Sequence, residues 1–340
     1  MAEDLGEAGH AYNLLELDDR LVHARAVQIA AELGIADLLS EGPRSSDDLA
    51  AATSSDPDAC HRMLRMLAAC GLFTETAPGA FGLTARGAPL RSDHPYTVRS
   101  ALRLNGTVVP LVIGGVEHSL RTGGPTFPAV LGESFHAYLE HAPEHADLFD
   151  TAMSELTQLM LPSLLAVYGF AGHMVDVGAG TGTLLRGVLR ATSGTSGVVF
   201  DTPRLAERAR EAILLDGLTD RCAVVSGDFF TEVPRGGDLY VLKWILHNWA
   251  DEPAGRILHR CRQAMTERAR LLVIESVLPE GPADTGHPAS TTMDVAMLVV
   301  QGGRERTGAE FTELLAGAGF RLERVVPTSS PYSILEARPL

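Results

Sequence analysis

The glycine-rich stretch at residues 175–182, Val-Asp-Val-Gly-Ala-Gly-Thr-Gly, is the first feature of the sequence that suggests chemistry. Glycines at alternate positions allow a tight turn from a strand into a helix, and they let a ligand approach the backbone with no Cβ in the way. Three interpretations fit this turn alone: a turn without a ligand, a dinucleotide site, or a site for another adenosine-containing cofactor. Asp176, Gly178 and Gly180 are candidate cofactor-binding residues.

Two acidic residues follow this turn, each at the end of an apolar run. Asp201 lies about 20 residues beyond the turn, where a carboxylate can accept hydrogen bonds from both ribose hydroxyls. Asp228 offers a carboxylate to an adenine amino group, and Phe229 offers its ring to the adenine. Taken singly, Asp201 also fits a helix cap ahead of Pro203, and Phe229 also fits a core position. Together the three groups favour an adenosine-type cofactor, either a dinucleotide or S-adenosylmethionine (SAM).

The elements that would position these residues form an alternating pattern. Short apolar runs separated by helical stretches occur at 174–177, 197–200, 223–225, 238–242, 271–274, 322–326 and 333–337. This alternation predicts parallel βαβ units in an open, doubly wound α/β sheet. Ligands of such sheets bind beyond the carboxyl ends of the strands, where the candidate residues fall.

The first half of the chain is helical in pattern, with apolar residues at three- and four-residue spacings from Leu14 to about Phe170. Two short helices with good cap residues are followed by a hairpin-like piece at 72–75 and 80–83. Helix, helix and two-stranded wing are typical of a winged helix, which in many proteins binds DNA. The expected recognition helix, 57–70, has few basic residues, so we favour a scaffold or dimerisation role.

Composition narrows the class of protein further. The formal net charge of −15 disfavours nucleic acid as a partner. The four cysteines lack the spacing of a zinc site or a disulfide framework, and we expect free thiols and no metal. No apolar run approaches the roughly 20 residues that span a bilayer. The acidic start, 1–7, does not resemble a secretion signal, so we expect a cytoplasmic protein without membrane contact.

A resemblance to a known family enters at residues 242–252, Leu-Lys-Trp-Ile-Leu-His-Asn-Trp-Ala-Asp-Glu. This segment resembles the caffeate/flavonoid type of SAM-dependent O-methyltransferase, including bacterial relatives that methylate polyketides and other natural products. The segments 273–279 and 302–307 match as well, as do Phe311 and Gly319-Phe320. The resemblance covers about 175–337, while the N-terminal half matches in layout only.

The resemblance implies a class I methyltransferase with a Rossmann-like sheet, SAM as cofactor, and a homodimer formed through a winged-helix-containing N-terminal domain. We therefore expect a dimerisation domain over 1–100, a helical linker and pocket-forming segment over 101–170, and a SAM-binding catalytic domain over 171–340. The implied reaction is methylation of a phenolic or enolic hydroxyl on an aromatic natural product. Two alternatives stay open: N-methylation or non-methylating SAM chemistry, and a ligand-sensing winged-helix regulator.

Family resemblance also implies the catalytic residues. His247 would be the general base, with Glu275 and Glu305 flanking its ring and holding its tautomer. A phenol has a pKa of about 10 and an imidazole about 6.5, so proton removal should accompany methyl transfer rather than precede it. A neighbouring carboxylate raises the basicity of the imidazole and narrows this gap.

The remaining expectations concern the surroundings of the base. Lys243 and Trp249 would lie near the cofactor, although a solvated strand end and a core position fit them too. Asp251 is expected to cap a helix, and Arg304 and Arg306 to form local ion pairs. The residues expected to line the acceptor pocket are Met153, Thr157, Asn248, Asp294 and Met297.

Overall fold

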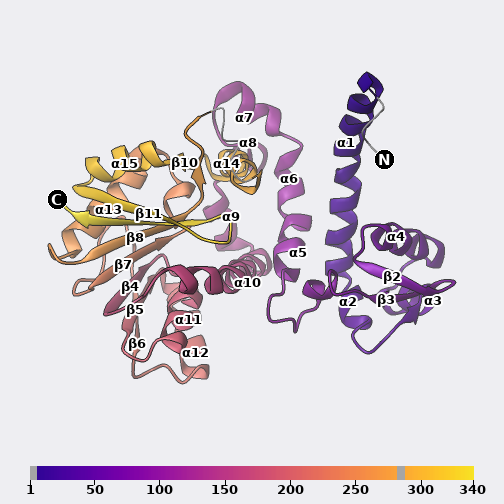
Figure 1. The fold of residues 1–340 in the computed structure, drawn as a ribbon, viewed down its shortest axis with the longest axis horizontal. Helices are drawn as coiled ribbons and strands as arrows, with labels where there is room; N and C mark the ends of the chain where they lie inside the picture. Colours follow the sequence, from indigo (N-terminus) through magenta and orange to yellow (C-terminus); the bar gives the residue numbers. More distant parts are fainter. Residues whose placement is uncertain (1–5, 282–287) are drawn as a thin grey trace. The chain divides into compact units, whose positions relative to one another are not determined.

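The computed structural model describes residues 6–281 and 288–340, so most of the acidic N-terminal stretch lies outside the described residues. The chain divides into two compact units. The first holds the chain up to Pro110 and Asp147–Glu155, and the second holds Leu111–Ala146 and Leu156–Leu340. The expected boundary after residue 100 falls inside helix α5, and the one after 170 falls between α10 and β4. Figure 1 labels the elements.

The first unit is mostly helical and contains a small three-stranded sheet. Its elements are α1 (Gly6–Glu32), α2 (Ile35–Leu38), β1 (Arg44–Ser45), α3 (Ser46–Thr53), α4 (Pro57–Ala69), β2 (Phe73–Ala77), β3 (Ala80–Leu83), the 3₁₀ turn η1 (Ala88–Leu90) and α5 (Arg99–Thr107). Strand β3 pairs antiparallel with both β2 and β1. The expected hairpin is therefore confirmed, with Gly79 in its turn at φ +75°.

Local capping explains where the two helices before the wing begin. The Ser45 side chain accepts a hydrogen bond from the Asp48 N–H at 3.0 Å at the start of α3. The Asp56 carboxylate does the same for Ala59 at 2.9 Å at the start of α4. Each cap satisfies a backbone donor that has no partner within the helix. The expectation of two capped helices before the hairpin is confirmed.

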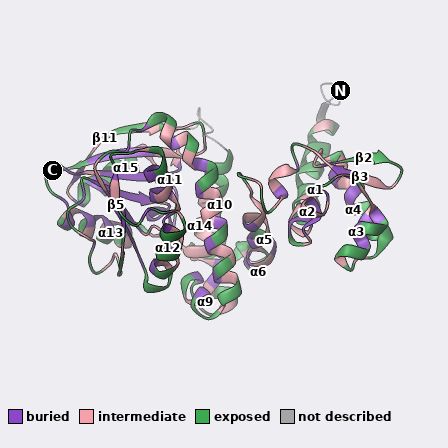
Figure 2. Cartoon of the chain, turned by 90° about the horizontal axis from the view of Figure 1, so that it is seen from below, coloured by how far each residue is buried: buried purple, intermediate pink, exposed green. Residues whose placement is uncertain are grey.

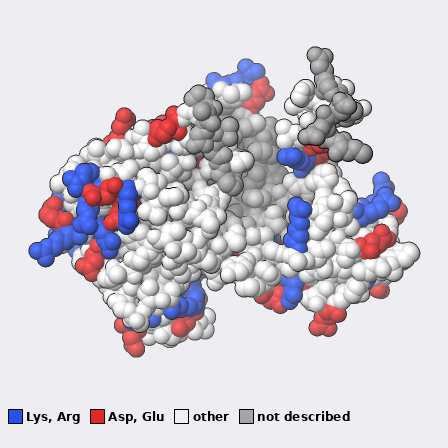
Figure 3. Space-filling view, in the orientation of Figure 1, with Lys and Arg blue, Asp and Glu red and all other residues white. Residues whose placement is uncertain are grey.

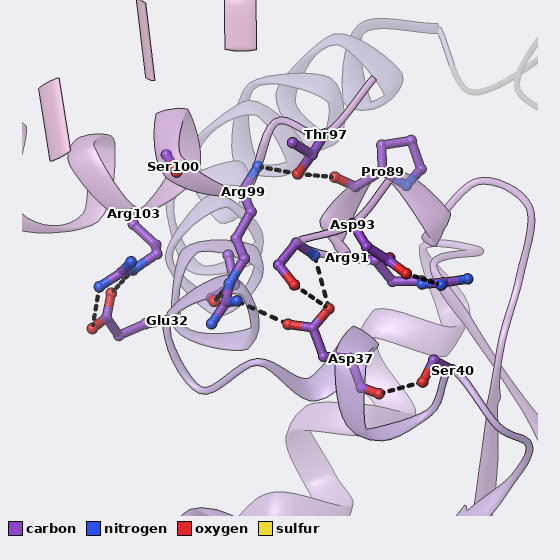
Figure 4. Close-up of polar contacts among 12 residues, drawn as sticks. Glu32, Asp37, Ser40, Pro89, Arg91, Asp93, Thr97, Arg99, Ser100 and Arg103 are labelled. Carbon is purple, nitrogen blue, oxygen red and sulfur yellow. Dashed lines mark hydrogen bonds and ion pairs between the residues drawn. The ribbon is translucent and has the colours of Figure 1, made fainter. Parts of the chain in front are cut away.

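Salt bridges and side-chain-to-backbone hydrogen bonds join α5 to α1 and α2, as Figure 4 shows. The Arg99 guanidinium pairs with Asp37 at 2.8 Å and donates to the Ala31 carbonyl at 2.8 Å. Arg103 pairs with Glu32 on α1 at 2.7 Å. These contacts fix the end of α1 within this unit.

The N-terminal half of α1 presents apolar side chains to solvent. Leu17 and Leu21 are 57% and 72% exposed, whereas Ala31 near the helix end is fully buried. The stripe expected along this helix therefore enters the core of the unit only in its second half. An exposed apolar helix face of this kind is typical of a surface that binds a protein partner.

The charges around α4 are mixed in sign. Arg62 pairs with Asp58 across one helical turn. On the face shown in Figure 3, basic and acidic side chains of this unit lie near one another. That face shows no continuous basic patch of the kind that binds nucleic acid.

The second unit is built on a seven-stranded sheet with the order β11-β12-β8-β7-β4-β5-β6. Its strands are β4 (His173–Val177), β5 (Ser196–Asp201), β6 (Cys222–Ser226), β7 (Leu239–Lys243), β8 (Arg270–Glu275), β11 (Phe320–Pro327) and β12 (Ser333–Pro339). The central strands β4, β7 and β8 are almost completely buried, as expected for a sheet covered on both faces. Figure 2 shows buried residues along the strands of this sheet.

The last two strands correct the expectation of a wholly parallel sheet. Strand β12 runs antiparallel to both β8 and β11. Only residues 328–332 connect β11 to β12, and a parallel crossover needs a dozen or more residues. The doubly wound α/β class holds, but the sheet is mixed.

Helices connect and cover the strands of this unit (Figure 1). They are α11 (Thr183–Ala191), α12 (Pro203–Leu215), α13 (Asp251–Ala264), α14 (Pro288–Gln301) and α15 (Gly308–Gly317), with the 3₁₀ turn η2 (Leu246–Asn248) and short strands β9 (Val277–Leu278) and β10 (Arg306–Thr307). Before the sheet come α6 (Val109–Ile113), α7 (Val116–Thr122), α8 (Thr126–Leu131), α9 (Phe135–His141) and α10 (Pro143–Val167), of which α6 and α10 cross between the units. None of the described helices is long and apolar enough to span a membrane.

Candidate active site

The glycine turn follows β4 directly and is built as its sequence predicts. Gly178, Gly180 and Gly182 all have φ between +60° and +73°, a conformation that favours glycine. A Cβ at Gly178 would overlap the Ile245 side chain, whereas one at Gly180 would meet nothing within 4 Å. The backbone at Gly180 is therefore open to a ligand.

Asp201 ties the end of β5 to this turn. One carboxylate oxygen accepts the Gly180 N–H at 2.7 Å, and the other accepts the Thr202 N–H at 2.7 Å. The cap position of α12 is Thr202 rather than Asp201. Asp201 thus fixes the backbone of the glycine turn at Gly180.

Aromatic rings extend from the glycine turn toward η2. The Phe229 ring lies next to the site that a Cβ of Gly178 would occupy. Its ring centroid is 5.0 Å from that of Phe230, and Phe230 meets Trp249 edge-on at 4.9 Å. The neighbouring Asp228 is exposed and accepts the Phe230 N–H at 2.9 Å. The structure thus brings Phe229, Trp249 and the glycine turn together.

Asp176 is buried and Lys243 is partly buried at the carboxyl ends of the adjacent strands β4 and β7. Burial raises the pKa of Asp176, against the opposing charge of Lys243. Burial likewise lowers the pKa of Lys243, although Asp176 and Glu275 oppose the shift. One Asp176 oxygen has no hydrogen-bond partner among the described residues. Such an atom is suited to bind a polar ligand group.

The residues of this site fit SAM. The open backbone at Gly180, the unpaired oxygen of Asp176 and the partly exposed aromatic rings provide polar and apolar contacts for an adenosine with a charged tail. Asp201 and Asp228 would hold the ribose and the adenine. Lys243 lies near Asp176, and Trp249 lies against Phe230.

His247 lies in η2, 6% exposed, and forms a buried pair with Glu305. Its Nδ1 is 2.8 Å from a Glu305 carboxylate oxygen. Because an ionised carboxylate only accepts hydrogen bonds, Nδ1 carries the proton and Nε2 is left as the basic nitrogen. Burial by itself would lower the pKa of His247, but the Glu305 hydrogen bond and the charges of Glu275 and Glu305 outweigh it and raise the pKa.

Glu275 differs from the expected arrangement, because its hydrogen bonds go to the backbone rather than to the imidazole ring. One oxygen accepts the N–H groups of Ile245, Leu246 and His247 at 3.1, 2.6 and 3.1 Å. The other oxygen has no partner among the described residues. Glu275 therefore holds the backbone at the start of the turn that carries His247. From this position its charge raises the pKa of the imidazole.

The segment before β10 packs directly on the same turn. The Arg304 N–H donates to the His247 carbonyl at 2.9 Å, and a Cβ at Gly303 would overlap that carbonyl. Arg306, 1% exposed, donates to the carbonyls of Leu246 at 3.2 Å and Trp249 at 2.9 Å. These contacts position Glu305 against the ring of His247.

Two expectations about charged neighbours can now be checked. Arg306 pairs with Asp251 at 2.8 Å and Arg304 pairs with Glu310, so the predicted local ion pairs are confirmed. The prediction that Asp251 caps α13 is wrong, because the cap residue is Ala250 and the Asp251 carboxylate binds Arg306 instead.

The expected acceptor residues have different surroundings. The Asp294 carboxylate accepts the Glu305 N–H at 2.9 Å, and the Met297 carbonyl accepts the Gly303 N–H at 3.2 Å. Asp294 and Met297 thus hold the segment that contains Glu305. Thr157 is buried on α10 within the second unit, whereas Met153 is partly buried on the part of α10 that belongs to the first unit.

Two family models match the chain. Residues 115–321 match the O-methyltransferase domain, and residues 15–91 match the O-methyltransferase dimerisation domain. The phenazine O-methyltransferase PhzM of Lysobacter antibioticus is 40% identical over 93% of this chain and 92% of its own length. The O-demethylpuromycin-O-methyltransferase of Streptomyces alboniger is 40% identical over 100% and 92%. The 8-amino-8-demethylriboflavin N,N-dimethyltransferase of Streptomyces davaonensis is 36% identical over 96% and 95%.

Solved structures show the same fold. The crystal structure of LaPhzM matches with a TM-score of 0.92 and 39% identity, over 97% of this chain and 99% of that one. The neocarzinostatin-biosynthesis O-methyltransferase NcsB1, in complex with SAM and 2-hydroxy-5-methyl naphthoic acid, matches with a TM-score of 0.79 and 38% identity over 94% and 96%. The chain therefore belongs to the family of SAM-dependent O-methyltransferases.

Proposed function

We propose that this protein transfers a methyl group to a phenolic or enolic hydroxyl of an aromatic natural product, with His247 as the general base. The observation that carries the proposal is the buried His247–Glu305 pair at 2.8 Å. This pair sets the tautomer of the imidazole and leaves Nε2 to take the acceptor's proton.

The energetics favour a base of this kind. The ordinary pKa values of a phenol and an imidazole differ by roughly 3.5 units, or about 5 kcal/mol of proton-transfer free energy. The charges of Glu305 and Glu275 raise the pKa of His247 and so reduce this gap. SAM, when bound, supplies a positively charged sulfonium from which a methyl group can be displaced. The protein contributes desolvation, alignment and removal of the proton.

Relatives support an aromatic acceptor. The names of the phenazine and puromycin enzymes describe O-methylation, and NcsB1 was solved with a naphthoic acid. In this chain α14 carries the partly buried residues Met293, Asp294 and Met297. Asp294 and Met297 accept hydrogen bonds from the segment that contains Glu305. Methionine side chains adapt well to flat aromatic ligands, and we place the acceptor against them. Thr157 and Asn248, in the same unit, are further candidates for this pocket.

The direct test is His247→Ala, assayed with SAM and a panel of hydroxylated aromatics by mass spectrometry for a methyl increment. We expect a loss of roughly 10²- to 10⁴-fold in kcat, the range that general bases contribute, with unchanged affinity for S-adenosylhomocysteine (SAH). The exposed His259→Ala on α13 serves as the matched control and should keep full activity. Methylation by His247→Ala at a near wild-type rate, with the cofactor bound, would refute the base assignment.

N-methylation is the second candidate, because one relative is named as an N,N-dimethyltransferase. An aromatic amine is already nucleophilic when neutral, so its methylation depends less on a base. We expect hydroxyl acceptors to be favoured and to depend strongly on His247. A panel that returns only methylated amines, with His247→Ala active on them, would favour N-methylation.

A further inference from the structure

The turn that carries His247 begins with a strained residue. Trp244 has φ +56°, a left-handed conformation that a bulky side chain rarely adopts. Its indole is buried, and the indole N–H has no partner among the described residues. Such a conformation persists only where its surroundings hold it. The next three N–H groups all point at Glu275, so the direction of the turn depends on Trp244.

Asn248 closes this turn from its other end. Its side-chain N–H donates at 3.0 Å to the carbonyl of Trp244, four residues earlier. This hydrogen bond therefore spans the segment that contains His247. Its amide oxygen accepts from the Gln301 side chain at 2.8 Å. Both halves of the amide are therefore used by the protein, and Gln301, the last residue of α14, holds Asn248 in place.

His136 on α9 lies beside the residue that follows Asn248. Its ring lies parallel to that of Trp249, with centroids 5.9 Å apart and planes 17° from parallel. Burial lowers the pKa of His136. The contact between the two rings holds the end of the segment that carries the base.

We propose that Gln301 is a positioning residue of the active site: through Asn248 it holds the left-handed Trp244, and thereby the turn that aims His247. The hydrogen bonds run in one direction, from Gln301 to Asn248 to the Trp244 carbonyl. Trp249, which follows Asn248 directly, packs against His136 and Phe230 and so joins this relay to the aromatic rings beside the glycine turn. The inference rests on the proposed role of His247.

Tryptophan fluorescence tests the relay without an acceptor substrate, because Trp244 and Trp249 are the two tryptophans of the chain. In a Trp249→Phe background the emission reports Trp244 alone. Adding Gln301→Met removes the hydrogen bond from Gln301 to Asn248 at similar volume. We expect a red shift of the Trp244 emission and stronger quenching by acrylamide. Val295→Ala, at a half-exposed position of the same helix, is the control and should change neither.

Kinetics in the otherwise native chain give the second readout, with an acceptor found by the panel. We expect Gln301→Met to lower kcat by roughly 10-fold, since displacing a catalytic group by a fraction of an ångström costs rate. The dissociation constant for SAH should stay within about twofold. Asn248→Leu removes the hydrogen bonds of Asn248 to Gln301 and to the Trp244 carbonyl, and should act in the same direction. The double variant should lose no more than Asn248→Leu alone, because both changes break one relay.

Three results would overturn the inference. One is an unchanged Trp244 emission in Gln301→Met, and another is losses of kcat that multiply in the double variant. A loss of SAH binding with an unchanged Trp244 signal would also overturn it, by assigning Gln301 to the cofactor site. If His247→Ala retains activity while Gln301→Met still shifts the Trp244 emission, the base assignment fails and the relay stands.

Discussion

At the scale of single residues, the active site is organised by where its buried charges have partners. Glu305 holds one nitrogen of His247, Glu275 holds the backbone of the same residue, and each glutamate keeps one oxygen without a partner among the described residues. Unpaired oxygens in a buried site keep their negative potential unquenched. The base is therefore made stronger by two carboxylates that reach it in different ways.

Replacing Glu305 by Gln separates charge from geometry at the base. The amide oxygen can still accept from Nδ1, but the negative charge that raises the pKa of His247 is gone. Because the neutral imidazole is the active form, the rate falls as the pH drops through the His247 pKa. We expect the acid limb of the kcat/KM–pH profile to move to lower pH in Glu305→Gln. The high-pH rate should fall by roughly 10-fold, because the base is weaker.

The control for this comparison is Glu313→Gln, at an exposed position on α15. It removes the same charge from the protein without touching the site, and its pH profile should match that of the native chain. An acid limb that stays in place in Glu305→Gln would contradict the electrostatic account of His247.

At the scale of elements, side chains from β8 and β10 hold the backbone of the η2 turn. The η2 turn is held at its start by Glu275 and along its length by Arg306. A single Glu275 oxygen accepts three buried N–H groups of this turn. Without that carboxylate, three buried donors would lose their acceptor.

Glu275→Ala should consequently destabilise the protein rather than only slow it. Leaving buried donors without an acceptor costs about 1–3 kcal/mol each, so we expect the free energy of unfolding to fall by about 3 kcal/mol or more. Urea unfolding followed by circular dichroism measures this loss. Glu275→Gln keeps an acceptor oxygen and should lose much less. Equal stability of Glu275→Ala and the native chain would show that the turn is held by other contacts.

The sequence predicted elements and local turns better than the partners of side chains. The glycine turn and Asp201 belong to one βα unit, where spacing along the chain determines what meets. Glu275 and Asp251 bind groups about 30 and 55 residues away, and no local pattern encodes these pairs. The left-handed Trp244 and the antiparallel β12 depend likewise on neighbours in space, although the short 328–332 connection was a signal for the latter.

At the scale of the whole molecule, the chain combines a SAM-binding unit with a dimerisation domain. Residues 15–91 match the family's dimerisation domain, and α1 exposes apolar side chains that its own unit does not cover. We infer a homodimer with α1 at its interface, since an exposed apolar helix face is otherwise costly in water.

Charged substitutions on α1 test this inference. Leu17→Glu combined with Leu21→Glu should convert the dimer into a monomer, which light scattering at micromolar concentration would detect as half the mass. Leu214→Glu with Leu215→Glu on α12, at positions 68% and 87% exposed, is the matched control and should leave the mass unchanged. A dimer that survives the α1 double variant would place the interface elsewhere.

The close packing of Gly303 on the His247 carbonyl has a consequence for protein engineering. Because a Cβ there would overlap the backbone of the catalytic turn, libraries that randomise residues 302–306 would consist mainly of inactive clones. The side chains of α14 offer more tolerance, since Met293 and Met297 are only partly buried. A search for new acceptors should therefore vary the helix and leave the glycine unchanged.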